Sequence, residues 1–171
     1  MITRVELVNF KKFRNQVFDL KGNIVLAGPN NSGKSTLIQA IAVWNLALKE
    51  WLAERSNSRA QIRTGVQLAR SKFTAIPLRE MNLLWNERVT GKRKGELIGD
   101  EKLGTPRPME IRLTGEYENR KWFIGMAFYY RFPDLVLIKP TDDTIIEDIP
   151  WVADRFSLLF VPSFSGIGIN E

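Results

Sequence analysis

The sequence predicts an α/β fold with a mixed sheet, an antiparallel meander and one long helix. Three observations support this prediction. A loop with two glycines, residues 28–36, lies between a short apolar run and a long segment that lacks Gly and Pro. Two alternating segments precede the loop, and three strand-like runs joined by tight polar turns occupy residues 109–139. Strands interleaved with helical segments are typical of α/β domains.

The chain begins with two segments that alternate loosely between apolar and polar residues. They are Ile2 to Asn9 and Phe13 to Leu20, with Lys11-Lys12 between them. Alternation with a period of two predicts strands, and the short basic break predicts that the two strands form a hairpin.

Residues 23–27, Asn-Ile-Val-Leu-Ala, predict a short buried strand directly ahead of the loop. The loop fits G-x-x-x-x-G-K-[ST] at every fixed position, and its residues are Gly28, Pro29, Asn30, Asn31, Ser32, Gly33, Lys34 and Ser35. Glycines at these positions let backbone N–H groups point into one concavity, where a polyphosphate is held against the next helix. Lys34 is expected to reach the β- and γ-phosphates of ATP, and the Ser35 hydroxyl to bind Mg²⁺.

The segment after the loop predicts the long helix. Ser35 to Glu54 is rich in Leu, Ile, Ala and Trp and contains no Gly or Pro. Trp44 and Trp51 are seven residues apart, so they share one face of the helix and are expected in the core. Trp122, in the meander, is likewise expected to pack in the core and not to stack on a base.

The middle of the chain, residues 55–107, predicts an irregular basic insertion. It carries twelve Lys or Arg residues and five Asp or Glu, although the whole chain has a net charge of +6. Leu78 to Val89 predicts a short helix. Lys92, Arg93 and Lys94, between two glycines, predict an exposed loop tip. Such a tip either contacts DNA phosphates or is simply a solvated surface.

The second half of the chain predicts mostly strands. Met109 to Tyr117, Lys121 to Arg131 and Leu135 to Lys139 predict the antiparallel meander, and Ser157 to Val161 predicts a further buried strand.

Composition limits the possible classes. With 171 residues and 44% apolar content the chain can bury a core, and its size predicts one domain, residues 1–171. It has no Cys and no His, which excludes disulfides, thiolate metal sites and histidine catalysis. The N-terminus lacks the apolar region of a signal peptide, and no apolar run is long enough to span a bilayer. We therefore expect a cytoplasmic protein without a membrane partner.

The stretch VELVNFKKFRNQVFDLKGNIVLAGPNNSGKSTLIQAI, residues 5–41, resembles the opening of ABC-type P-loop ATPases. These are the SMC and RecF-like proteins and the OLD-type ATPases of chromosome maintenance and defence. In that family a strand ending in Asn-Phe is followed by a short basic or polar turn, a second strand and G-x-N-x-S-G-K-S-T. The meander at 109–139 and the run at 157–161 are similar to the rest of the family's N-terminal lobe. Residues 73–85, FTAIPLREMNLLW, are similar to a stretch in bacterial members of the superfamily.

The resemblance implies that residues 30–36, Asn30 to Thr36, hold the phosphates of ATP. It also implies that Lys11 or Lys12, in the turn of the hairpin, contacts the phosphates or the base. The family has a Gln after the strand that matches Ser157–Val161, whereas this chain has VPSFSGIGINE and no Gln. Ser163 or Ser165 is expected to replace it, unless the contact with Mg²⁺ comes from elsewhere.

The sequence lacks recognisable motifs for the groups that hydrolyse ATP. Hydrolysis needs a Walker B carboxylate at the end of an apolar strand, and the candidates, Asp142, Asp143, Asp148 and the ELIGDE segment, are expected in surface turns. The family's signature segment and switch His are also absent. In the family these groups lie in a C-terminal lobe and in a second ATPase head. We therefore expect the chain to be the N-terminal lobe of a longer or split ATPase, inactive alone.

Three other classes fit less of the sequence. A GTPase needs a D-x-x-G after the loop, but Asp19-Leu20-Lys21-Gly22 precedes it. A self-contained small-molecule kinase would need a lid, for which Arg88, Arg93 and Arg107 are available. A non-catalytic nucleic-acid-binding module would explain the basic insertion but not the phosphate loop.

Overall fold

The computed structural model describes residues 1–56, 64–74, 76–92 and 94–158. In chain order its helices and strands are β1 (Ile2–Phe10), β2 (Phe13–Asp19), α1 (Lys34–Ser56), β3 (Val66–Ala69), β4 (Met109–Tyr117), β5 (Arg120–Phe132), β6 (Leu135–Pro140) and α2 (Asp148–Arg155). Four 3₁₀ turns lie between β3 and β4: Arg70–Lys72, Met81–Leu84, Asn86–Arg88 and Lys94–Glu96. Among these residues no helix is both long and apolar enough to cross a lipid bilayer.

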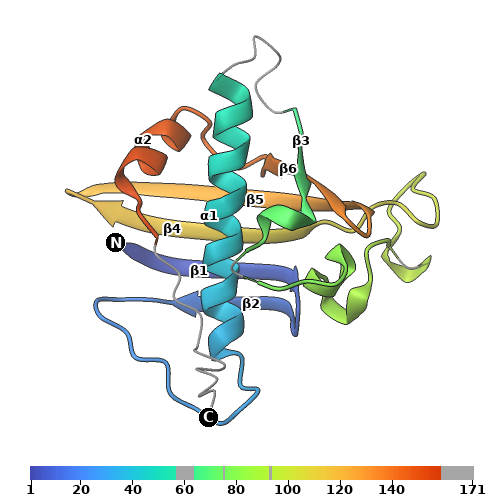
Figure 1. Cartoon of the computed structure of the whole chain (residues 1–171), viewed down its shortest axis with the longest axis horizontal. Coiled ribbons are helices and arrows are strands. Elements are labelled where there is room, and N and C mark those ends of the chain that lie inside the picture. The colour runs from blue at the N-terminus through green and yellow to red at the C-terminus, as the bar shows by residue number, and fades with distance from the viewer. Residues whose placement is uncertain (57–63, 75, 93, 159–171) are drawn as a thin grey trace, which may run out of the picture.

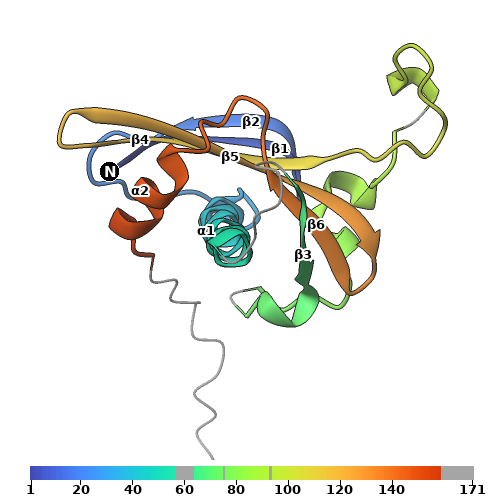
Figure 2. The ribbon, with the colours of Figure 1, turned by 90° about the horizontal axis from the view of Figure 1, so that it is seen from above.

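The described strands form a six-stranded sheet in the order β2-β1-β4-β5-β6-β3, and every neighbouring pair is antiparallel. Both helices lie on the same face of this sheet, and α1 crosses its strands (Figures 1 and 2). The predicted hairpin, long helix and meander are therefore confirmed.

The core lies between this face of the sheet and α1. Residues that alternate along β4 and β5, such as Ile111, Leu113 and Ile124, are fully buried there. The indole N–H of Trp44 donates to the Ile124 carbonyl at 2.9 Å, and the Trp44 ring stacks on Trp122 with 6.1 Å between centroids. The prediction that the tryptophans of α1 and the meander belong to the core is confirmed, because Trp44, Trp51 and Trp122 are at most 5% exposed.

The predicted strand at 23–27 is wrong, and with it the mixed sheet. These residues lie outside every strand, and Val25 is 91% exposed. Within the described residues, no backbone–backbone hydrogen bond joins 23–27 to another segment. A strand exists only where a neighbour satisfies its N–H and C=O groups, and the apolar run has no such neighbour here. Figure 1 shows the segment between β2 and α1 running out from the body as a long loop.

The predicted helix from Leu78 to Val89 is also wrong. The structure has two 3₁₀ turns there, on either side of Trp85. Trp85 is buried, and its indole N–H donates to the Arg107 carbonyl at 2.8 Å. Glu87 has φ 52°, which ends any helix. Of the strand predicted at 157–161, residues 157 and 158 are irregular, and 159–161 lie outside the described residues.

Candidate functional site

The loop between residues 28 and 33 has the backbone that its glycines predict. Gly28 has φ 149° and Gly33 has φ 105°, values that L residues rarely adopt, and Asn31 is left-handed with φ 65°. Gly33 also lies under the hairpin, because a Cβ there would be 2.5 Å from Cζ of Phe13. Both glycines are therefore required by conformation, and Gly33 by space as well.

Lys34 closes the loop in this structure. Its ammonium donates to the carbonyls of Gly28 and Pro29 at 2.6 and 2.7 Å and to the Ser32 hydroxyl at 3.3 Å. The cation thus already lies against the loop that would enclose a phosphate. A bound phosphate would exchange these neutral acceptors for charged oxygens, which form stronger hydrogen bonds.

The start of α1 offers further donors to an anion. The helix begins at Lys34, and the Leu37 N–H bonds to the Gly33 carbonyl at 3.0 Å. The N–H groups of the preceding residues in the first turn have no carbonyl one turn back within the helix. No acidic residue lies in the first turn of α1. The positive end of the helix dipole therefore faces the loop without a competing carboxylate.

A cavity of about 200 Å³ adjoins the loop. It is lined by residues of β2, the exposed run, the loop and α1: Phe18, Leu26, Ala27, Ser32, Gly33, Lys34 and Leu37. The donors described above and the backbone of the two glycines fit a polyphosphate ligand. The cavity beside them is lined mainly by apolar side chains.

The two lysines of the hairpin turn have different positions. The Lys12 side chain is exposed, and its ammonium donates to the Asn31 carbonyl in the loop. The Lys11 ammonium is part-buried and donates instead to the Gln39 side chain on α1 at 2.5 Å. Burial lowers the pKa of Lys11. Of the two candidates, Lys12 therefore reaches the phosphate loop, and Lys11 joins the turn to the helix.

Ser35 and Thr36 occupy the first turn of α1, with Ser35 exposed and Thr36 half-buried. The Ser35 side chain offers one hydroxyl to a metal ion, and the described residues contain no cluster of three acidic side chains that could hold a metal alone. A Mg²⁺ ion at Ser35 would therefore take most of its ligands from phosphate oxygens and water.

The acids that imitate a Walker B motif are engaged elsewhere. Asp143 pairs with Arg112 at 3.2 Å, and Arg112 alternates along β4 with the core residues, so it lies on the sheet face opposite α1. Asp148 pairs with Arg120 at 2.5 Å. Asp142 is 90% exposed and 4.0 Å from Lys139.

The ELIGDE segment is also committed to local contacts. Glu101 accepts two bonds from Lys92 at 2.6 and 2.7 Å and one from the Ile98 N–H at 3.0 Å. The bonds from Lys92 and Ile98 lower the pKa of the Glu101 carboxyl.

The last part of the basic insertion, which leads into β4 and is drawn yellow-green, projects from the body (Figure 2). The prediction of a wholly exposed tip is wrong for Lys92, whose side chain is only 22% exposed because it pairs with Glu101. Lys94 is exposed. Arg93 lies outside the described residues, as do Ser163 and Ser165. Arg107, a candidate for a kinase lid, is 11% exposed and 3.5 Å from Glu96.

Comparison with known families gives a match for the N-terminal part of the chain. Residues 4–48 match the family model described as an AAA domain. The match spans the hairpin, the loop and more than half of α1, and it supports a nucleotide-binding ATPase domain of AAA type over these residues. No curated protein matches the chain.

Sequence reasoning missed three residues around the loop. Phe13 packs on Gly33, Gln39 binds Lys11, and Asn86 donates to the Lys11 carbonyl at 2.7 Å. The position of Phe13, directly after the basic turn, could have indicated that it lies near the loop. No sequence signal could have identified Gln39 and Asn86, because their contacts join segments that are distant in sequence.

Proposed function

We propose that the chain binds ATP with Mg²⁺ through residues 28–36 and is the Walker A half of an SMC/RecF-like, ABC-type ATPase head. The observation that carries this proposal is the position of the Lys34 ammonium, which lies against the loop carbonyls at the open N-terminus of α1. In this role Lys34 neutralises phosphate charge, Ser35 binds Mg²⁺, and Lys12 covers the loop from the hairpin.

The exposed apolar run supports a partner lobe. Ile24, Val25 and Leu26 are 42, 91 and 37% exposed, and Ile38, on the first turns of α1, is 45% exposed. An apolar segment that leads through a loop into a helix has the sequence order of the first half of a β-α-β unit, in which a parallel strand lies beside the first one. No described strand fills this place. We propose that a strand of a C-terminal lobe pairs with residues 24–27.

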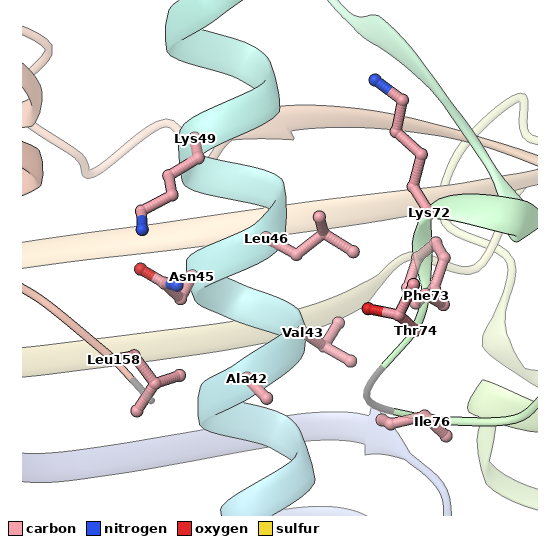
Figure 3. Close-up of a pocket in the computed structure, with 10 residues that line it drawn as sticks. All are labelled: Ala42, Val43, Asn45, Leu46, Lys49, Lys72, Phe73, Thr74, Ile76 and Leu158. Carbon is pink, nitrogen blue, oxygen red and sulfur yellow. The ribbon is translucent and has the colours of Figure 1, made fainter. Parts of the chain in front are cut away.

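A hollow also lies along α1. It has a volume of about 350 Å³, and its lining includes Ala42, Val43, Leu46, Phe73, Thr74 and Ile76. Figure 3 shows Val43 and Leu46 directed towards the segment that carries Thr74 and Ile76, with Asn45 on the other side of the helix, towards Leu158. We propose that this hollow is a second surface that the partner lobe covers.

The same lobe, and a second head, would supply the groups for hydrolysis. Binding ATP in the ground state does not lower the reaction barrier, which requires groups around the γ-phosphate and the attacking water. Of the candidate acids, Asp143 and Asp148 are held in ion pairs with Arg112 and Arg120. We propose that ATP brings two heads together and that hydrolysis separates them, in DNA repair, chromosome maintenance or phage defence. This activity would be cytoplasmic, with DNA contacted through Lys92, Arg93 and Lys94.

Titration calorimetry with MgATP tests the binding proposal. We expect saturable heat with the wild-type chain and its loss in Lys34→Ala. Lys49→Ala is the matched control, because Lys49 is an exposed lysine further along the same helix, and it should bind like the wild type. Absence of heat with the wild type, or equal binding by Lys34→Ala, would refute the nucleotide site.

A further inference from the structure

The insertion is anchored on the hairpin turn that carries the loop-facing lysine. Phe10 and Trp85 form an antiparallel bridge between β1 and the insertion. The Lys11 N–H donates to the Leu84 carbonyl at 2.7 Å, and the Asn86 side-chain amide donates to the Lys11 carbonyl at 2.7 Å. Both backbone groups of Lys11 are therefore bound by residues 84–86.

Lys11 needs this support because its backbone is left-handed. Its φ is 47°, a conformation that is unfavourable for a residue other than glycine. Its side chain is held by Gln39 on α1. The backbone bonds to the insertion and the side-chain bond to α1 together fix this residue in an unfavourable conformation.

The conformation of Lys11 sets the direction of the next residue. Lys12 follows it directly, and the Lys12 ammonium reaches the Asn31 carbonyl and lies 5.6 Å from the centroid of the Phe13 ring. Phe13 in turn packs against Gly33. If the Lys11 peptide rotates, the Lys12 side chain leaves the loop, because their backbones are joined.

We infer that Asn86 is a positioning residue for nucleotide binding: its amide fixes the Lys11 peptide so that the Lys12 ammonium lies at the phosphate loop, within reach of a bound phosphate. This inference rests on the proposed ATP site and adds to it a role for the basic insertion. Asn86 itself touches no phosphate in this arrangement. Its effect on affinity must therefore pass through Lys12.

A double-mutant cycle on MgATP affinity tests this, with Asn86→Ala, Lys12→Met and the pair in the full chain. Lys12→Met removes one charged hydrogen bond to phosphate and should weaken binding by about tenfold. Asn86→Ala should weaken binding by about three- to tenfold in the wild-type background and by less than about twofold in Lys12→Met. Asn86→Leu has a similar shape but neither an amide donor nor a charge, so it should behave like Asn86→Ala. Asn15→Ala, an exposed asparagine on β2, is the control.

The outcomes separate the inference from the proposed function. Equal losses from Asn86→Ala in both backgrounds would show a general structural effect and overturn the inference, as would full affinity in both Asn86 variants. Far-UV circular dichroism identifies a variant that fails to fold, in which case the other Asn86 variant decides. Absence of MgATP binding by the wild type would instead refute the proposed function itself, and the inference with it.

Discussion

Replacing Gly33 with alanine should destabilise the protein through two effects that the structure separates. The alanine Cβ would lie 2.5 Å from the Phe13 ring, and the backbone would keep φ 105°. The backbone conformation costs about 1–3 kcal/mol in a non-glycine residue. The Phe13 ring packs edge-to-face against Phe18, with 5.4 Å between the ring centroids. Displacing it costs about 1–3 kcal/mol more. The expected loss of unfolding free energy is therefore about 2–6 kcal/mol, a large part of the total for a small domain.

Urea unfolding followed by tryptophan fluorescence measures this loss, because Trp44, Trp51 and Trp122 are buried in the folded protein. Gly95→Ala is the matched control, since a Cβ at Gly95 meets nothing within 4 Å, and it should change the free energy by less than about 0.5 kcal/mol. Adding Phe13→Leu should remove the steric part and give a coupling of about 1–3 kcal/mol in the double-mutant cycle. If Gly33→Ala unfolds at the same urea concentration as Gly95→Ala, this reasoning is wrong.

Three further predictions follow from charged groups. The pKa of Glu101 is lowered by its bond from Lys92, so Glu101→Gln should reduce stability at neutral pH. The difference from wild type should shrink as the pH falls below about 4.3, the ordinary pKa of Glu, and vanish below the lowered pKa of the folded protein. Burial lowers the pKa of Lys11 in the folded protein. Just below about pH 10.4, the ordinary pKa of Lys, the Lys11 amine is therefore protonated in the unfolded chain but not in the folded protein. The stability of the wild type relative to Lys11→Met should rise with pH in this range. Both predictions are tested by measuring the urea midpoints of the variant and the wild type over a range of pH. A difference between the two midpoints that does not change with pH would contradict the prediction concerned. Replacing Lys92, Arg93 and Lys94 with Gln should weaken DNA binding by the complete ATPase and flatten its salt dependence; unchanged affinity at low salt would make the loop only a solvated surface.

The elements that the sequence predicted are those set by local periodicity. Alternation of apolar and polar residues predicts the hairpin and the meander, and an unbroken apolar segment predicts α1. The same alternation predicts which residues of β4 and β5 are buried. The run at 23–27 has equally good local signals, but a strand needs a partner, and the partner is a non-local property. The helix predicted from Leu78 to Val89 is wrong for a similar reason, because Trp85 is anchored by the distant Arg107 carbonyl.

The candidate site shows the same division. The motif located the loop and the positions that need glycine, because those requirements lie within a few residues of each other. The choice between Lys11 and Lys12 depends on one left-handed residue whose backbone is held by Leu84 and Asn86. No pattern in residues 5–41 contains that information.

The most direct test of the central claim is to measure binding and turnover of ATP on one sample. The purified chain is equilibrated with MgATP labelled on the γ-phosphate, and the retained nucleotide and the released phosphate are counted, with Lys34→Ala as the background. The loop, Lys34 and the start of α1 predict that the wild type retains intact ATP above the Lys34→Ala level and releases no more phosphate than that variant. Failure to retain ATP would contradict the nucleotide site, and sustained phosphate release above Lys34→Ala would show that an acid within this chain, such as Asp142, Asp143 or Asp148, completes the catalytic site without a partner lobe.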